Sequence, residues 1–441
     1  MTPVGDRCDP STWPDALRQA MSALPPSKTF YIALSGGVDS LFLLHAVVGW
    51  FSARRDVVVR AVHVNHQLQG SADRMEAFCQ SACDALGVVL TVRRITIGQP
   101  TDSLENQARK ARYRVFEDVL GAGDLLLLGH HADDQAETVL FRLVRGSGVR
   151  GLSGMPVTRR LGSGALYRPL LPMTREMIAD LARGWGLTWQ DDPTNSDTRF
   201  DRNYLRHEVL PSIRQRWPAA LDGIGRSARH CEESEQLSRS LATYQRRDIE
   251  DDQQRLRVRP LSALPFAEQK NLLRCWIIDH GCTPPGAAKQ AQGFSDLVSE
   301  DPRRTPELCA EGYRILRYAD CLYLVIDQPE PPARVIWETT GVLQWDQFDL
   351  ELQPERAAPA ELVVTRRQGG ERFRPRPGGP SRPLKKWLQE QAVPPWERDR
   401  LPLVWYSGEL VAIGDLWLAR GVLAENQPLP LRIVRRRIFV E

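Results

Sequence analysis

The sequence predicts an α/β protein with a doubly wound parallel sheet, followed by a helical middle domain and a small α+β C-terminal domain. In roughly the first 200 residues, apolar runs of strand length alternate with amphipathic stretches of helix length, as in parallel sheets covered by helices. The pattern then becomes mostly helical, and it ends in short β-type segments around one helix. We place the three domains at 1–216, 217–332 and 333–441.

The elements of the first domain are expected in strict alternation. Strands are expected at 30–34, 57–64, 88–95 and 124–128, with a further apolar piece at 166–171. Helices are expected at 40–51, 73–86, 104–120, 132–145 and 174–185. Gly121 and Gly123 provide a stop signal after the third of these helices, and a turn-rich segment at 191–195 closes the unit.

The C-terminal part shows a different pattern of elements, with short strands around one helix. Strands are expected at 335–337, 348–352, 362–365, 401–406, 410–418 and 431–440, and one helix is expected at 384–391. Pro394 and Pro395 end the helical pattern there. These segments predict the small α+β module.

Composition excludes several classes of protein. With 441 residues, 42% of them hydrophobic and 26% charged, the chain can bury sizeable cores, so neither a collagen-like nor a disordered chain fits. No apolar run approaches the ~18 residues of a membrane helix. The eight cysteines form no Cys-x-x-Cys pair and are expected to be reduced thiols, with Cys79 and Cys83 packed on one helix face. We therefore expect a cytoplasmic protein without a membrane partner.

The strongest local signal is a loop between the first expected strand and the first expected helix. Its residues are Ser35-Gly36-Gly37-Val38-Asp39-Ser40. The two glycines allow a sharp turn that presents backbone N–H groups, and these groups, the serine hydroxyls and the helix dipole together would hold a phosphate. A carboxylate replaces the lysine of a Walker-type loop, and Asp39 is suited to a Mg²⁺ bound to released pyrophosphate. The alternative is an ordinary strand-to-helix turn.

A second signal follows the fourth expected strand, in the segment from Gly129 to Thr138. The spacing places His130, Asp134 and Glu137 on one helix face at the carboxyl edge of the sheet. An imidazole and two carboxylates on one face attract an ammonium group. Acids at a helix N-terminus also act as caps and dipole partners, which is the structural alternative.

Basic groups recur near the same expected edge. His63 ends the second strand, and Arg109 and Arg112 share a helix face at i,i+3 spacing that suits a phosphate. The alternatives are a hydrogen-bonded strand-end histidine and solvated surface charge. Arg145 opens a glycine-rich loop that could close over an anion. A stripe spaced i, i+3, i+7 could bind nucleic-acid phosphates or the adenylate: Arg199, Arg202 and Arg206.

The C-terminal domain is basic. Between Glu355 and Glu441 there are 16 lysines and arginines against 10 acidic residues, whereas the whole chain has a net charge of only +3. This excess favours an anionic partner, although a solvated basic surface is the alternative. Lys385 and Lys386 would attract phosphates. Three aromatic residues could stack on an unpaired base or form core, and core is favoured for the tryptophans: Phe373, Trp387 and Trp396.

The loop at Ser35–Ser40 resembles that of the N-type ATP pyrophosphatases, the PP-loop superfamily, which cleave ATP between the α- and β-phosphates and adenylate an oxygen of their substrate. Further segments resemble the tRNA(Ile)-lysidine synthetases, over nearly the whole chain. They are His63–His66, Gly129–Thr138, Arg145–Leu152, Arg168–Leu171, Asp192–Asn195 and Arg199–Arg206. Segments 372–375, 384–390 and 393–396 resemble the extra domain of the longer members.

The resemblance implies a Rossmann-like PP-loop domain that binds ATP on the loop at Ser35–Ser40 with His63 beside the nucleotide, and Mg²⁺ near Asp39. The C2 oxygen of the wobble cytidine of tRNA(Ile) with a CAU anticodon would be adenylated. The ε-amine of free lysine would then replace AMP, giving lysidine and changing the codon read from AUG to AUA.

The resemblance also implies roles for individual side chains. Asp134 and Glu137 would hold the lysine ammonium, and Arg112 and Arg206 would stabilise phosphate and developing negative charge. Either His131 or water would take the proton of the amine. Arg145, Arg199, Arg202, Lys385 and Lys386 would bind substrate. A homodimer stays open.

Three rival functions share part of these signals. A tRNA thiolation enzyme would use the same loop but needs reactive or cluster-binding cysteines, for which the sequence shows no pattern. An RNA-binding module would bind tRNA without ATP turnover, which the intact loop and acids disfavour. A glutamine-dependent synthetase would need an amidotransferase domain, and no segment provides one.

Overall fold

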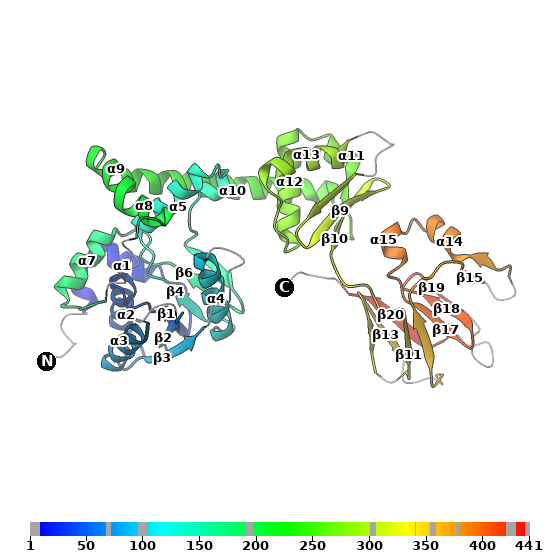
Figure 1. The fold of residues 1–441 in the computed structure, drawn as a ribbon, viewed down its shortest axis with the longest axis horizontal. Helices are drawn as coiled ribbons and strands as arrows, with labels where there is room; N and C mark the ends of the chain where they lie inside the picture. The colour runs from blue at the N-terminus through cyan, green and yellow to red at the C-terminus, as the bar shows by residue number, and fades with distance from the viewer. Residues whose placement is uncertain are drawn as a thin grey trace. The chain divides into compact units, whose positions relative to one another are not determined.

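The computed structural model describes residues 9–67, 72–95, 104–190, 197–299, 306–339, 341–352, 359–375, 379–419 and 429–436. The chain divides into two compact units, Met1–Leu237 and Ser238–Glu441 (Figure 1). Within the described parts, the structure contains no helix that is both long enough and apolar enough to span a bilayer. The predicted segment Asp192–Asn195 lies outside the described residues.

The N-terminal unit is built on a six-stranded sheet with the order β3-β2-β1-β4-β6-β5 (Figure 1). Its strands are β1 Thr29–Ala33, β2 Val58–Asn65, β3 Val89–Arg94, β4 Leu125–Leu127, β5 Thr158–Leu161 and β6 Gly164–Tyr167. All neighbouring pairs are parallel except β5–β6, which forms an antiparallel hairpin at the edge. The predicted parallel sheet is confirmed, and the edge strand β5 is an addition.

The helices of this unit agree closely with the predicted ranges. They are α1 Asp15–Ser22, α2 Val38–Trp50, α3 Ala72–Ala85, α4 Leu104–Val119, α5 Ala132–Val144, α6 Val149–Leu152 and α7 Arg175–Gly184. The sequence missed α1, which buries Leu17 and Met21 against the core.

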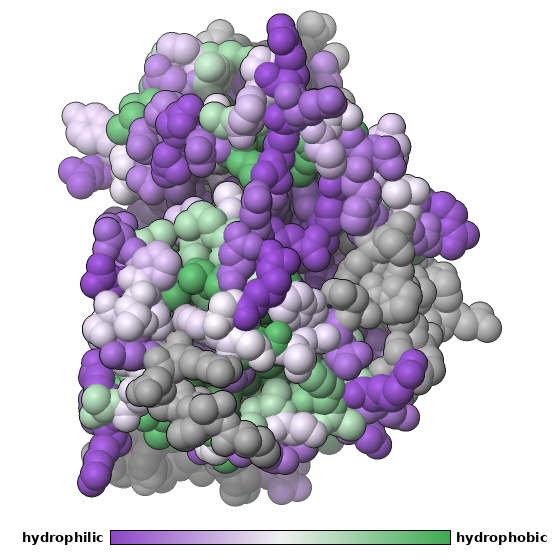
Figure 2. Space-filling model, turned by 90° about the vertical axis from the view of Figure 1, so that its left-hand side faces the viewer, coloured by the Kyte–Doolittle hydropathy of each residue, from purple (hydrophilic) through white to green (hydrophobic). Residues whose placement is uncertain are grey.

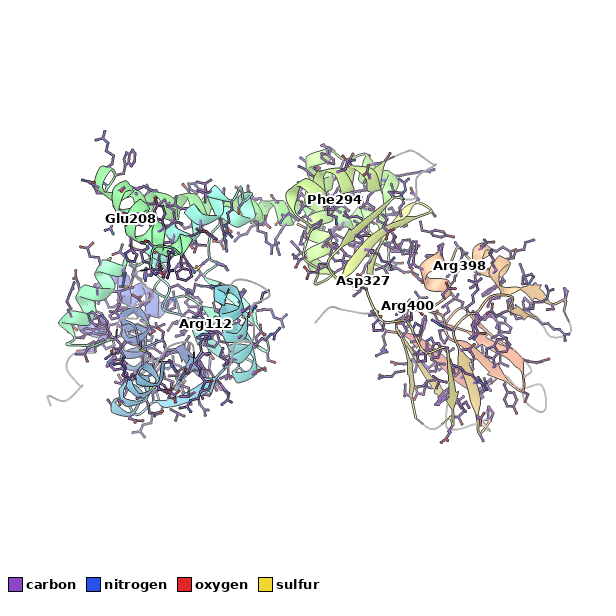
Figure 3. The ribbon with its side chains drawn as sticks, viewed as in Figure 1. Arg112, Glu208, Phe294, Asp327, Arg398 and Arg400 are labelled. Atoms are coloured by element: carbon purple, nitrogen blue, oxygen red, sulfur yellow. The ribbon has the colours of Figure 1, made fainter. Side chains whose placement is uncertain are left out.

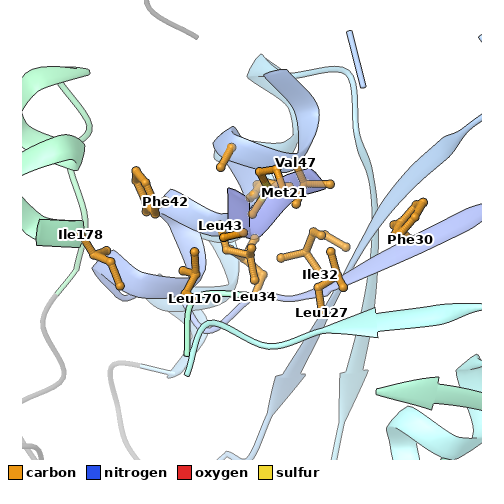
Figure 4. Close-up of a cluster of buried hydrophobic side chains, with 14 of the residues drawn as sticks. Met21, Phe30, Ile32, Leu34, Phe42, Leu43, Val47, Leu127, Leu170 and Ile178 are labelled. Atoms are coloured by element: carbon orange, nitrogen blue, oxygen red, sulfur yellow. The ribbon is translucent and has the colours of Figure 1, made fainter. Parts of the chain in front are cut away.

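Alternate strand residues face opposite sides of the sheet, so the unit has two cores. Phe30, Ile32 and Leu127 pack with α1, α2 and α7, and Figure 4 shows this cluster. On the other face, Tyr31 and Leu126 pack with residues of α4. This sandwiching of the central strands explains their continuous apolar runs.

An irregular helical segment completes the first unit. It consists of α8 Asp201–Tyr204, a π-helical turn η3 Leu205–Val209 and α9 Leu210–Arg216, followed by the start of α10 Ala220–Ile249. The sequence predicted Arg199, Arg202 and Arg206 on one helix face. That prediction is wrong for Arg199, because it precedes the helix and its guanidinium binds Asp197 at 2.7 Å.

The C-terminal unit begins with α10, α11 Val258–Ser262, α12 Phe266–Asp279 and α13 Ala287–Val298. These helices pack on an antiparallel sheet in the order β7-β10-β9-β8. Its strands are β7 Leu256–Arg257, β8 Glu307–Ala310, β9 Tyr313–Tyr318 and β10 Cys321–Ile326. The prediction of a mostly helical domain missed this sheet, because its strands are short and mix buried side chains such as Ile315 with arginines.

The last part of the chain is β-rich, as predicted. A five-stranded sheet has the order β11-β14-β17-β18-β19, with β11 Arg334–Trp337, β14 Leu362–Thr365, β17 Leu403–Tyr406, β18 Glu409–Ile413 and β19 Trp417–Leu418. A second sheet joins β12 Leu343–Trp345, β13 Phe348–Leu352 and β20 Leu431–Arg435, and a third pairs β15 Arg372–Phe373 with β16 Arg382–Pro383. Two helices accompany them, α14 Leu384–Glu390 and α15 Pro395–Arg398.

The aromatic residues of this module belong mainly to its core. Phe373 and Trp387 are buried, and their rings meet edge to face with centroids 5.2 Å apart. Trp396 is partly buried and packs against the rings of Tyr318 and Tyr323. The prediction of core tryptophans is confirmed for Trp387, so base stacking by that ring would require it to leave the core.

The face of the molecule in Figure 2 is mostly hydrophilic, with hydrophobic side chains in small separate patches. The N-terminal unit has a pocket where the parallel strands β1, β2 and β4 end. Chains at the carboxyl edge of such a sheet leave a crevice where ligands bind.

Candidate active site

The loop after β1 has a geometry that only glycine tolerates at Gly36. This residue has φ +90°, and an added Cβ would lie 2.2 Å from the Met75 sulfur. Gly37 then forms the N-cap of α2 and offers no side chain to the first N–H groups of the helix. These N–H groups are therefore directed at the space before the helix, as in an anion-binding loop.

The two serines of the loop hold its shape. Ser40 Oγ accepts a hydrogen bond from the Ser35 N–H at 3.1 Å and lies 3.0 Å from Ser35 Oγ. It also donates to the Gly37 carbonyl at 3.1 Å. The hydroxyls thus fix the backbone turn. Backbone amides are left as the main hydrogen-bond donors to a phosphate.

A pocket of about 590 Å³ opens beside this loop. Five elements besides the loop contribute polar side chains to its lining. They are β2 with the residue after it (His63 and His66), α4 (Arg112), the start of α5 (His130 and Asp134), α7 (Arg175) and η3 (Arg206). Figure 3 marks Arg112 within the N-terminal unit. The structure thus brings together most of the first-domain residues that the sequence predicted for the site.

Two histidines lie at the end of β2, of which His63 is buried and His66 is partly buried. His63 is 5% exposed, and its Nδ1 lies 2.8 Å from the Leu34 carbonyl, so it links β2 to the start of the loop. Burial, together with Arg112 and His63, lowers the pKa of His66 to about 4. His66 is therefore neutral at physiological pH, and its buried Nδ1 has no hydrogen-bond partner within the described chain.

Asp39 faces the pocket from the first turn of α2. Its Oδ1 is buried and lacks a hydrogen-bond partner among the described residues. Its Oδ2 lies 3.7 Å from Nε2 of His131. Because a buried carboxylate oxygen is normally satisfied, this Oδ1 atom fits the role of a ligand for an incoming group.

His131 is the centre of a carboxylate cluster. The ring is 2% exposed and forms the N-cap of α5. Asp133 Oδ2 lies 3.6 Å from Nδ1, and Asp134 Oδ2 lies 3.4 Å from Nε2. Burial disfavours a charged ring, but Asp133, Asp39 and Asp134 outweigh burial and raise the pKa of His131 to about 10.

One contact argues for a neutral ring, because the Asp134 N–H lies 3.4 Å from Nδ1 and would need an acceptor there. That contact is long, whereas three carboxylates surround the ring. We therefore assign His131 as an imidazolium. A ring that already holds both protons is poorly suited to accept the proton of an amine.

The charge of His131 predicts a pH dependence of stability. A pKa of about 10 in the folded protein lies above the ordinary value of 6.5, so the stabilisation is complete below pH 6.5 and is lost as the pH rises through 10. We expect the free energy of unfolding to fall between these values by up to ~1.4 kcal/mol per pH unit. Urea unfolding of the protein and of His131→Gln measures it. A difference between the two that does not shrink with rising pH would contradict the assignment.

Arg206 occupies the two carboxylates that were predicted to hold an ammonium. Its Nε donates to Glu137 Oε1 at 2.6 Å, and its Nη2 donates to Glu137 Oε2 at 3.0 Å and to Asp134 Oδ1 at 2.8 Å. Burial raises the pKa of Glu137, and the guanidinium opposes this. The sequence predicted that Glu137 would hold a substrate ammonium. In the structure the side chain has no exposed surface, so it is not accessible to one. Asp134 still lines the pocket.

The other predicted arginines separate into two groups. Arg202 lies beside the pair of Arg206 and Glu137, with Nη2 donating to Thr138 Oγ1 at 3.2 Å and Nε 3.8 Å from Glu137. Arg145 is exposed, lies 3.9 Å from the centroid of the Phe141 ring and contacts Asp201 at 3.4 Å. Arg199 and Arg145 thus lie on the surface of the unit rather than in the pocket lining.

Sequence reasoning missed the residues that brace the site. Arg142 donates to the carbonyls of Gly151 and Gly154 at 2.9 and 2.7 Å and so fixes the glycine-rich loop. Asp133 accepts a hydrogen bond from the Arg175 N–H at 2.8 Å at the start of α7. Arg168 donates to Nδ1 of His130 at 3.1 Å. The contacts of Asp133 and Arg168 join segments that are 42 and 38 residues apart, so local spacing held no signal for them.

The bond from Arg168 sets the state of His130. Since Nδ1 accepts, the remaining ring proton lies on Nε2. Burial lowers the pKa of His130 to about 3, with Asp134 opposing and three arginines assisting. His130 is therefore a neutral donor at the pocket.

Lys385 and Lys386 lie on α14 of the C-terminal unit, where both are exposed. Leu384, Trp387 and Leu388 turn to the core, so the lysines occupy the solvent side of an anchored helix. They belong to the C-terminal unit, whereas the pocket lies in the N-terminal unit.

Comparison with known proteins covers nearly all of the chain. Residues 14–213 match the family described as PP-loop domain, 256–323 the TilS substrate binding domain and 362–434 the TilS substrate C-terminal domain. A tRNA(Ile)-lysidine synthase of Alkalilimnicola ehrlichii is 38% identical, over 94% of this chain and 96% of that protein. The chain belongs to the tRNA(Ile)-lysidine synthase family.

Other lysidine synthases show the same extent of similarity. That of Coxiella burnetii is 36% identical over 94% of both chains. That of Pseudomonas putida is 39% identical over 88% of this chain and 92% of the relative. The predicted resemblance is confirmed, and with it ATP use through a PP-loop domain.

Cys79 and Cys83 lack the reactivity that thiolation chemistry would need. Cys79 and Cys83 are buried, and burial raises their pKa values to about 12 and about 11. Thiols with such pKa values are inert at neutral pH. Among the described residues, no group of three or more metal-ligating side chains is assembled that could hold a metal.

Proposed function

We propose that this protein joins free lysine to C2 of the wobble cytidine of tRNA(Ile) with the CAU anticodon, converting ATP to AMP and diphosphate. The observation that carries the proposal is the agreement of nearly the whole chain with tRNA(Ile)-lysidine synthases. The pocket beside the loop at Ser35–Ser40 supports the proposal, because the backbone amides at the N-terminus of α2 suit a nucleotide phosphate. The product tRNA would read AUA instead of AUG.

Two bond exchanges complete the reaction. The C2 oxygen of the cytidine attacks the α-phosphorus of ATP, and the bond to the β-phosphate breaks to release diphosphate. The ε-amine of lysine then attacks C2, and the bond from C2 to the oxygen breaks, so AMP leaves with that oxygen. The protein contributes mainly by placing the reactants and stabilising charge.

Asp39 fits a Mg²⁺ site. Its buried, unpartnered Oδ1 offers a single carboxylate oxygen beside the phosphate loop. Mg²⁺ commonly uses one or two carboxylates together with phosphate oxygens and water. When bound, the ion would neutralise charge on the departing diphosphate. Arg112 and His66 offer further polar groups in the pocket lining.

For lysine, we propose that Asp134 receives the ammonium and that Glu137 acts indirectly. Asp134 lines the pocket, while Glu137 fixes the guanidinium of Arg206. Arg206 also lines the pocket and can therefore face a phosphate or the negative charge of the first step. Water is the better acceptor for the amine proton, because His131 already holds its protons.

We propose that Lys385 and Lys386 contact tRNA phosphates. Replacing both with Gln is expected to weaken tRNA binding and to reduce the slope of log K against log salt by about one per lost contact. Filter binding over a salt series measures this slope. Glu390→Gln on the same helix is a matched surface control, and an unchanged slope in the double lysine variant would remove this surface from the RNA site.

Product analysis tests the proposed chemistry. With ATP labelled in the α-phosphate, we expect AMP to form only when tRNA and lysine are both present. An adenylated tRNA intermediate should accumulate when lysine is left out. Formation of ADP instead of AMP would contradict the proposal.

A further inference from the structure

Four arginines beside the pocket carry positive charge that no carboxylate of the described chain neutralises. We call Arg109, Arg142, Arg159 and Arg168 the arginine cluster. Arg168 is 3% exposed, and its hydrogen bonds go to neutral acceptors, the Pro156 carbonyl at 2.6 Å and His130. Arg142 likewise binds only backbone carbonyls. Burying a cation without a counter-ion costs stability.

Tyr113 organises the exposed half of the cluster. The guanidinium carbons of Arg109 and Arg159 lie 5.0 and 4.9 Å from the centroid of its ring. Cation–π contacts of this kind hold a guanidinium in place without consuming its hydrogen-bond donors. Arg109 comes from α4 and Arg159 from the edge strand β5, so two distant segments present their donors together.

The charges of the cluster repel one another. Burial and the nearby Arg159 and Arg109 lower the pKa of Arg168, although Tyr113 partly opposes this. Burial and Arg109, Arg202 and Arg150 lower the pKa of Arg142. A repulsive arrangement that the fold nonetheless maintains is relieved when a polyanion binds.

The position of the cluster distinguishes between two anions. Tyr113 lines the pocket, but Arg109 and Arg159 are exposed and lie outside its lining. A triphosphate held on the loop at Ser35–Ser40 would stay within the pocket, whereas an RNA strand whose base enters the pocket must continue outside it. The surface therefore suits a chain of phosphates rather than a single nucleotide.

We propose that the exposed half of the arginine cluster, Arg109 and Arg159, binds the phosphate backbone of the tRNA next to the nucleotide that enters the pocket, while Arg142 and Arg168 add positive charge to this region. The proposal rests on the proposed function for the identity of the RNA. It assigns the β5–β6 hairpin and the exposed face of α4 as an RNA contact. Guanidiniums that keep free donors are suited to phosphate oxygens.

The test is Arg109→Gln combined with Arg159→Gln, with tRNA binding measured by filter binding between about 50 and 300 mM salt. We expect the slope of log K against log salt to fall by about one per arginine, and the affinity at physiological salt to fall on the order of tenfold. Arg54→Gln combined with Arg183→Gln is the control. It removes the same charge from exposed arginines that pair with Asp56 and Asp180.

Parallel measurements separate the possible failures. Binding of ATP without tRNA should be unchanged in the double variant, and Arg159→Gln alone, on an exposed edge strand, should give half of the slope change. An unchanged slope, or weaker ATP binding with a normal slope, would overturn the assignment. Because the readout is binding, a wild-type protein that binds tRNA but fails to incorporate lysine would disprove the proposed function and leave the cluster testable.

Discussion

Asp39→Asn is expected to reduce tRNA-dependent release of diphosphate by at least ~10³-fold, because the variant keeps the shape of the side chain but loses its negative charge. The unpartnered Oδ1 of Asp39 is the pocket atom best suited to a metal bound to the phosphates. An enzyme-coupled diphosphate assay in excess Mg²⁺ measures the rate.

Asp56→Asn provides a matched control, since Asp56 is exposed and pairs with Arg54 outside the pocket. This variant should keep the wild-type rate. Thermal unfolding of Asp39→Asn should stay cooperative, so that loss of rate is separable from loss of fold. Diphosphate release within tenfold of wild type in a folded Asp39→Asn protein would show that the loop does not use this carboxylate.

Arg206→Met is expected to destabilise the N-terminal unit by up to about 3–5 kcal/mol, because the buried carboxylate of Glu137 loses its closest cation and keeps the more distant Arg202 guanidinium, 3.8 Å away. Part of this penalty is avoided if Glu137 takes up a proton, which its raised pKa favours. Urea unfolding followed by tryptophan fluorescence measures the loss. Ligation activity should also disappear, since Arg206 lines the pocket.

A double-mutant cycle isolates the cause. Arg206→Met combined with Glu137→Gln removes both charges, and it should recover much of the stability lost in Arg206→Met. Activity should not recover with it, because the pocket still lacks the guanidinium. If the loss of stability in the double variant equals the sum of the losses in the two single variants, Arg206 and Glu137 are not coupled and the pairing has been misassigned.

The sequence predicted the framework of the site well because that framework is local. The turn at Gly36, the cap of α2 and the helix face of Asp134 each follow from a few neighbouring residues. Apolar strands buried on both faces of a sheet also leave a strong pattern, so the four parallel strands β1 to β4 and the helices between them were predicted, whereas α1, α6 and β5 were missed. The carboxyl edge of the sheet then fixed where the site lies.

The partners of the charged residues were beyond sequence reasoning. Glu137 was expected to meet a substrate amine, but its partner Arg206 lies 69 residues further along the chain. The pairing depends on how α8 and η3 fold back on α5, which no local pattern contains. The same reason hid the contacts of Arg168 with His130 and of Arg159 with Tyr113.

The most direct test of the central claim is incorporation of radiolabelled lysine into bacterial tRNA by the purified protein. We expect acid-precipitable label that depends on ATP, survives the mild base that cleaves aminoacyl esters, and is confined to one isoleucine tRNA. Absence of label, with tRNA still triggering release of AMP and diphosphate, would contradict lysine as the nucleophile while leaving the adenylation chemistry of the pocket in place.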